Sequence, residues 1–199
     1  MWFRPMGLNV CVATADQLLR DACSDAFGGF GPGDAQRPAD LRFDLSLGDG
    51  EYPERVEPVF RFEGSHAYAE IAPHCRLAVD LVRGVACGRF PADLVREGAL
   101  FRHHFLQFGL NAMLPSKGFL GLHAAALVKD GRGVLLRGAS GVGKTVLTYA
   151  GARSRFQALA DSTVWVLRFG RKVGRKQKTM EHGQRLNCVQ CFTYIRLQA

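Results

Sequence analysis

The amino-acid sequence predicts an α/β protein in which a small mixed α+β region precedes a core of the phosphate-loop type. Three observations support this fold class. Short stretches of alternating apolar and polar residues indicate strands, and Gly, Pro and Asp turn signals separate them. Two stretches with apolar residues at helical spacing indicate helices. A glycine-rich turn, Gly138 to Thr145, lies between an apolar strand and a predicted helix.

Composition excludes several classes of protein. The 199 residues are 47% hydrophobic and 22% charged, which excludes wholesale disorder and collagen-like repetition. No apolar run approaches the roughly 18 residues that a membrane-spanning helix needs. The start, MWFRPMGLNVCVATADQLL, has no long apolar core, so we expect a cytoplasmic protein without a membrane partner. The six cysteines are therefore expected to be reduced.

The N-terminal region, residues 1–114, contains most of the predicted strands. A helix is expected from Asp16 to Phe27, followed by a loop over residues 28–40. A second helix is expected from Ala99 to Leu114. Between the two helices, alternation predicts strands at 41–47, 59–62, 67–71, 77–82 and 85–90, the last two joined as a hairpin around Arg83-Gly84.

The core, residues 115–167, has a different pattern. Apolar strands are predicted at 122–128 and 134–136, a helix at 144–152, and further strands at 156–160 and 164–167. Strand, glycine-rich turn, helix and strand is the order of a βαβ unit.

The glycine-rich turn matches the phosphate-binding pattern G-x-x-x-x-G-K-[ST] at every fixed position. Its glycines let the backbone turn N–H groups towards phosphate oxygens, and the helix that follows favours an anion at its N-terminus. Lys144 is expected to reach the β- and γ-phosphates, and the Thr145 hydroxyl to bind Mg²⁺. The predicted nucleotide-binding residues are Gly138, Ala139, Ser140, Gly141, Val142, Gly143, Lys144 and Thr145.

A phosphate loop needs an acid to complete its metal site. Asp161 follows the short apolar strand 156–160, and ligands of open α/β sheets lie at the carboxyl ends of strands. Asp161 is therefore the candidate to hold Mg²⁺ or to accept a proton from an attacking hydroxyl. The alternative is a turn aspartate, because Asp-Ser-Thr also favours turns.

The stretch from Leu122 to Leu167 resembles the ATP-binding core of bacterial HPr serine kinase/phosphorylases. That family has a His-Ala or His-Gly strand, a hairpin, the phosphate loop, a helix, and an acidic pair that opens a second hairpin. His123, the Gly138–Thr145 loop and Asp161 stand at the matching positions. The family's fold is a phosphate-loop variant related to phosphoenolpyruvate carboxykinase.

The resemblance implies ATP-dependent phosphorylation of a protein serine with Mg²⁺, and catalytic roles for Lys144, Asp161 and His123. His123 is also compatible with a half-buried strand residue. The sequence departs from the family at Ser162, where the acidic pair is reduced to a single acid, and after residue 167. A catalytically inactive or truncated nucleotide-binding remnant is therefore the second hypothesis. The resemblance is also compatible with a homo-oligomer.

The tail, residues 168–199, carries eight Lys and Arg against one acid, Glu181, a net charge of +7. A nucleic-acid-associated NTPase is the third hypothesis, but a solvated, disordered and protease-sensitive tail is favoured over a nucleic-acid partner. Cys188 and Cys191, with His182 upstream, form only half of a zinc site. His103 and His104 diverge by about 100° on their predicted helix, so they do not share one metal.

Overall fold

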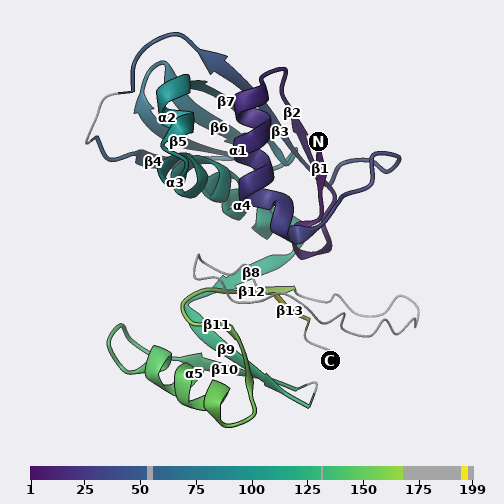
Figure 1. The fold of residues 1–199 in the computed structure, drawn as a ribbon, viewed down its shortest axis with the longest axis vertical. Coiled ribbons are helices and arrows are strands. Elements are labelled where there is room, and N and C mark those ends of the chain that lie inside the picture. Colours follow the sequence, from purple (N-terminus) through teal and green to yellow (C-terminus); the bar gives the residue numbers. More distant parts are fainter. Residues whose placement is uncertain (53–55, 131, 168–193, 197–199) are drawn as a thin grey trace. The chain divides into compact units, whose positions relative to one another are not determined.

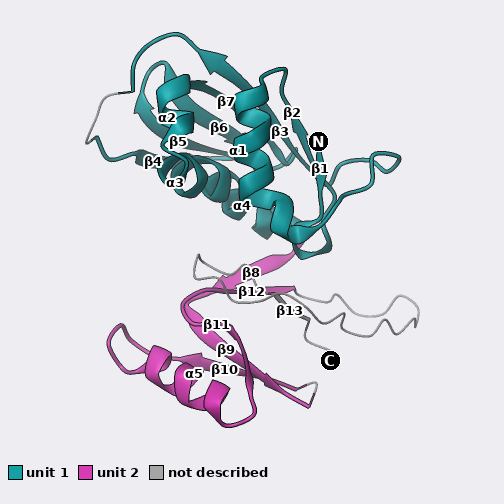
Figure 2. Cartoon of the chain, in the orientation of Figure 1, with its two compact units in different colours: residues 1–117 teal, residues 118–199 magenta. Residues whose placement is uncertain are grey.

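The structure is a computed structural model that describes residues 1–52, 56–130, 132–167 and the strand at 194–196. The chain divides into two compact units, residues 1–117 and 118–199 (Figure 2). The boundary predicted from the sequence was at Leu114. No helix in the described ranges is long and apolar enough to cross a membrane. The predictions for the basic residues and for Cys188, Cys191 and His182 lie outside the described residues.

The described residues of unit 1 form a seven-stranded mixed sheet (Figure 1). Its spatial order is β1 (Trp2–Phe3), β2 (Val10–Ala13), β3 (Leu41–Gly48), β7 (Val85–Pro91), β6 (Cys75–Asp80), β5 (His66–Ala72) and β4 (Val59–Glu63). The central strands β2, β3 and β7 are parallel, and every other neighbouring pair is antiparallel.

Helices cover one face of this sheet. They are α1 (Gln17–Phe27), α2 (Ala92–Arg96), α3 (Ala99–Phe101), a π-helical segment η3 (Arg102–Gln107) and α4 (Phe108–Met113). Short 3₁₀ turns lie at η1 (Pro5–Gly7), η2 (Gly28–Phe30) and η4 (Leu114–Lys117). At Gly109 the helix lies so close to the sheet that a Cβ would stand 2.8 Å from Leu77.

Buried phenylalanines form the core between helices and sheet. Phe43 of β3 packs against Phe27 of α1, with ring centroids 5.7 Å apart. Phe90 of β7 lies 4.9 Å from the rings of Phe101 and Phe105. Burying each such side chain contributes about 1.5–3 kcal/mol. The alternation predicted for 41–47 and 85–90 therefore has its physical origin in this one-sided core.

Unit 2 contains the predicted phosphate loop. Its elements are β8 (Phe119–Leu122), β9 (Ala124–Lys129), β10 (Arg132–Arg137), α5 (Lys144–Arg153), β11 (Gln157–Ala160), β12 (Val164–Leu167) and β13 (Tyr194–Arg196). One three-stranded sheet has the order β10-β9-β11, and another has the order β13-β12-β8. The general α/β class predicted from the sequence is thus present in the described residues.

The sequence-based boundaries hold for most elements, but one predicted strand is divided and several short elements were missed. The strand predicted at 122–128 is two strands, because the chain bends at His123 between β8 and β9. The prediction also missed β1, β2, β8 and α2. Each of these has only two to five residues, too few to show a periodicity.

Candidate nucleotide-binding site

Three separated segments meet at one edge of the sheet in unit 2. Strands β10 and β11 are both antiparallel to β9, which lies between them. They are therefore parallel to each other, and their carboxyl ends lie at the same edge as the amino end of β9. The phosphate loop follows β10, Asp161 follows β11, and His123 precedes β9. Topology alone thus brings the three predicted site segments together (Figure 1).

The strand registers make this juxtaposition more precise. Arg137 pairs with Ala124, so the next position places Gly138 opposite His123. Ala160 pairs with Ala126, and Val164 pairs with Leu122. The register is the same on both sides of the interruption at residues 161–163. Since neighbouring strands are about 4.8 Å apart, β10 and β11, which carry the loop and Asp161, lie two strand spacings or about 10 Å apart.

Glycine is required at two loop positions by backbone conformation. Gly141 has φ +80° and Gly143 has φ +96°, in the left-handed region that side chains disfavour. A Cβ at either position would meet no atom within 4 Å, so the requirement is conformational and not steric. Gly143 is also the N-cap of α5, and the loop therefore passes directly into the helix.

Lys144 points into the loop that precedes it. Its ammonium donates hydrogen bonds to the carbonyl oxygens of Gly138 and Ala139, at 2.8 and 2.9 Å. The residue is only 9% exposed. An ammonium group has three donors, so one N–H remains for an anion that enters the loop.

The loop also holds unused backbone donors. In the described part of the chain, the N–H groups of Gly141, Gly143, Lys144 and Thr145 donate to no other group. The last two belong to the first turn of α5, whose N–H groups have no partner within the helix. Together with the helix dipole, these donors suit a phosphate group.

The face of helix α5 towards the sheet carries small residues and a polar residue whose hydroxyl is satisfied within the helix. Thr148 is 6% exposed and its hydroxyl donates to the carbonyl oxygen of Lys144 at 2.9 Å. A Cβ at Gly151 would lie 2.7 Å from Leu127 of β9, so the helix approaches the strand closely there. The outer face of the helix is apolar and exposed at Val146, Leu147 and Tyr149.

Within the described residues, the acidic side of the site consists of Asp161 alone. Asp161 is exposed and forms no ion pair with the described residues, while Ser162 beside it is half-buried. The other acid in the described part of unit 2, Asp130, lies in the turn after β9, at the opposite edge of the sheet. No three His, Cys, Asp or Glu side chains gather as a metal site in the described ranges.

The donor set nevertheless fits Mg²⁺. This ion prefers oxygen ligands, and proteins usually hold it through one or two carboxylates plus substrate phosphates. Thr145 and Asp161 both offer exposed oxygen atoms at the same edge. His123 is exposed there as well. Thr163, which the register places opposite His123, was not singled out from the sequence, and only the strand pairing points to it.

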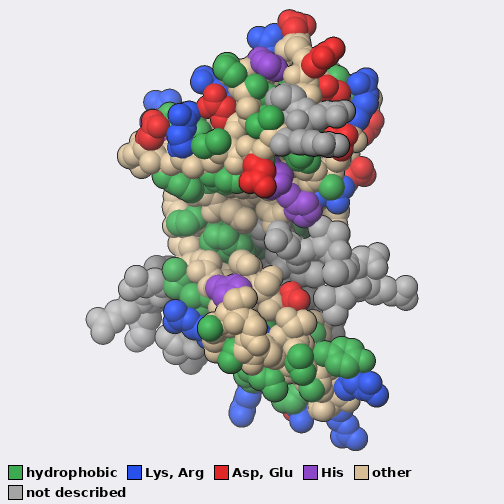
Figure 3. Space-filling model, turned by 90° about the vertical axis from the view of Figure 1, so that its left-hand side faces the viewer, with side chains coloured by type: hydrophobic (Ala, Val, Ile, Leu, Met, Phe, Trp, Pro, Cys, Tyr) green, Lys and Arg blue, Asp and Glu red, His purple; other side chains and the backbone are tan. Residues whose placement is uncertain are grey.

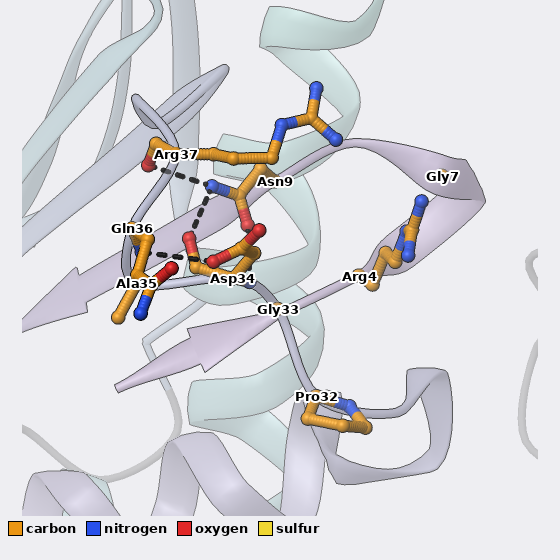
Figure 4. A pocket seen from close by; sticks show the side chains of 9 residues that line it. All are labelled: Arg4, Gly7, Asn9, Pro32, Gly33, Asp34, Ala35, Gln36 and Arg37. Atoms are coloured by element: carbon orange, nitrogen blue, oxygen red, sulfur yellow. Dashed lines mark hydrogen bonds between the residues drawn. The ribbon is translucent and has the colours of Figure 1, made fainter.

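Unit 1 has a separate cavity of about 430 Å³, lined by residues of the first turn and of the loop before β3 (Figure 4). Asn9 lies at its inner wall and is 5% exposed. Its amide nitrogen donates to the carbonyl oxygens of Asp34, Arg37 and Pro38, and its Oδ1 accepts the N–H of Asp34. Both N–H donors of the side chain and its Oδ1 are thus used to hold the loop, which indicates a structural role for Asn9.

Comparison with known proteins does not assign the chain to a family. No protein-family model, no curated protein and no solved structure matches this chain. The class of site therefore rests on the sequence motif and on the arrangement of its residues.

Proposed function

We propose that the chain binds Mg-ATP at the Gly138–Thr145 loop and transfers the γ-phosphate to a protein serine. The proposed fold of unit 2 is the phosphate-loop type of HPr kinase and phosphoenolpyruvate carboxykinase. The convergence of the loop, Asp161 and His123 at one sheet edge supports the proposal most strongly. Phosphoryl transfer depends on positioning and charge neutralisation, and these residues are of the types that supply both.

Each residue has a distinct part in this proposal. The loop N–H groups and the third donor of Lys144 would bind phosphate oxygens. Thr145 and Asp161 would hold Mg²⁺, which neutralises charge on the phosphates when bound. His123, opposite Gly138 in register, would lie beside the phosphates.

Asp161 has two possible roles that predict different results. If it holds the metal, Asp161→Asn weakens Mg-dependent ATP binding. If it accepts the serine proton, the same change spares binding and slows transfer, because positioned bases contribute about 10²–10⁴-fold.

A second candidate function is nucleotide binding without phosphoryl transfer. Ser162 favours this second function, because the family that the sequence resembles has a second acid at this position. The unpaired Asp161 then lacks either a metal-binding or a proton-accepting partner.

The test is transfer of radiolabel from ATP to a serine-bearing protein. We expect transfer by the natural chain, with Asp161→Asn reducing it at least tenfold. Asp130→Asn is the matched control, because it removes an acid from the same unit at the opposite sheet edge, and asparagine tolerates the left-handed φ of +50° there. Transfer that is unchanged in Asp161→Asn contradicts the role of this residue.

Ser162→Asp separates the two candidate functions. If the natural chain binds ATP without transferring phosphate and Ser162→Asp gains transfer, the binding-only function is correct and the missing acid is its cause. Transfer by the natural chain rules the binding-only function out.

A further inference from the structure

Strand β4 is an open edge of the sheet in unit 1. It is last in the strand order and pairs only with β5 among the described residues. All five of its residues are exposed, including Val59 at 58%, Phe60 at 44% and Phe62 at 64%. An exposed apolar edge strand is a template for pairing with another chain. Figure 3 views this side of the molecule, and apolar side chains reach the surface of unit 1 there.

The exposed phenylalanines of β4 form an aromatic ridge with the helical face. Phe60 and Phe62 are two residues apart and so lie on the same side of the strand. Both pack against Phe108 of α4, with ring centroids 4.9 and 5.9 Å apart. Phe60 also lies 6.0 Å from the ring of His104. These contacts hold the two rings in place while leaving much of their surface exposed.

The backbone of β4 directs its unused groups outward at these same residues. The two-residue turn Gly64-Ser65 closes the hairpin on the pair Glu63 and His66. In an antiparallel ladder, hydrogen-bonded pairs alternate along the strand. Arg61 and Glu63 therefore make their backbone hydrogen bonds to β5, while Phe60 and Phe62 turn their N–H and C=O groups to the free edge.

We propose that β4 pairs antiparallel with β4 of a second copy of this chain. In the register centred on Arg61, Phe60 stands opposite the partner's Phe62, and the reverse pair forms by symmetry. Each of these pairs exchanges two N–H···O bonds between the outward backbone groups. The aromatic rings then meet across the interface on the helical side, which is a favourable cross-strand pairing.

Charge on the other side of the strand selects a second copy as the partner. Arg61 and Glu63 carry opposite charges two residues apart, so a two-fold axis places each diagonally across from the opposite charge of its copy, within reach of long side chains. Arg61 also bonds to Glu70 on β5 at 2.8 Å, which offsets the charge of the facing Arg61 of the copy. The strand thus offers a copy of itself two aromatic pairs and two diagonal Arg61–Glu63 contacts, while Glu70 compensates the facing pair of arginines.

Sedimentation equilibrium of the full chain tests this proposal. We expect a concentration-dependent dimer, and we expect the dissociation constant of the dimer to be at least tenfold higher in Phe62→Lys. Val82→Lys is the control, because it introduces the same charged residue in place of a 75% exposed apolar side chain, in the turn between β6 and β7. Circular dichroism of each variant checks that unit 1 remains folded.

A charge reversal tests the register. Glu63→Arg should weaken the dimer, because it places two arginines diagonally across the interface while leaving the Arg61–Glu70 ion pair intact. A wild-type chain that stays monomeric, or a dimer unaffected by Phe62→Lys, overturns the proposal. A dimer unaffected by Glu63→Arg overturns the self-complementary register. None of these outcomes depends on ATP binding.

Discussion

The ammonium of Lys144 donates a 2.8 Å hydrogen bond to the carbonyl oxygen of Gly138, six residues earlier in the chain. This bond ties the end of the loop to its beginning. Because the lysine is almost buried in the loop, its charge stands inside the turn before any ligand enters. Under the proposed function, ligand binding would not have to order the loop at the full entropic cost.

Replacing Gly143 by alanine should weaken ATP binding. Its φ of +96° disfavours a side chain by roughly 1–2 kcal/mol, so about a tenfold loss of affinity is expected if the loop shifts to relieve the strain. Gly28→Ala is the control, because Gly28 also has open space but a φ of −57°. Equal loss of affinity in the two variants, measured by calorimetry, would contradict a conformational role for Gly143.

Asn9→Ala should destabilise unit 1. The change leaves the carbonyl oxygens of Asp34, Arg37 and Pro38 without their shared donor, and unsatisfied polar groups cost about 1–3 kcal/mol when buried. Urea unfolding followed by circular dichroism measures the loss. Gln36→Ala changes an exposed side chain of the same cavity and should leave the midpoint within experimental error. A midpoint equally unchanged in Asn9→Ala is the contrary result.

Two buried thiols should resist alkylation. Burial raises the pKa of Cys23 and of Cys75 from 9.0 to about 12, whereas Cys87 is exposed. At pH 9.0, iodoacetamide should modify Cys87 well before the other two, as mass spectrometry would detect. Guanidinium should abolish the difference. Equal rates for Cys23 and Cys87 in the folded chain would refute this prediction.

The same thiols predict how stability depends on pH. Unfolded thiols ionise near 9.0, but the folded ones stay protonated up to about 12. The unfolded state therefore binds fewer protons in this window, and the unfolding free energy falls as pH rises through it. Cys23→Ala should flatten this slope in urea titrations between these two pH values, and an unchanged slope would count against it.

Local patterns predicted most of the described elements. The hairpin of β6 and β7 followed from alternation around Arg83-Gly84, and Gly84 has the positive φ, +71°, that such a turn needs. The Gly138–Thr145 loop was likewise predicted from its residue types, since Gly141 and Gly143 supply backbone conformations that few other residues adopt. These features depend on residues close together in the chain.

Features that depend on distant pairing could not be predicted. Strand β2 has only four residues, and it is stabilised by its pairing with β3 and by the burial of its side chains. The bend at His123 divides a mostly apolar stretch, and the interruption at 161–163 matches it across the sheet. The pairing of β11 with the far side of β9 is what brings Asp161 to the end of the sheet that holds the loop, and no local periodicity encodes that order.

Calorimetric titration of Mg-ATP into the natural chain, Lys144→Ala and Lys129→Ala tests nucleotide binding at the loop most directly. Lys129 is the matched control, since it ends β9 at the opposite edge of the same sheet. Charge-assisted hydrogen bonds contribute about 1.5–3 kcal/mol, so Lys144→Ala should bind about tenfold more weakly or worse, with Lys129→Ala unchanged. Equal affinity of the natural chain and Lys144→Ala, or no binding by the natural chain, would contradict a nucleotide site at Gly138–Thr145.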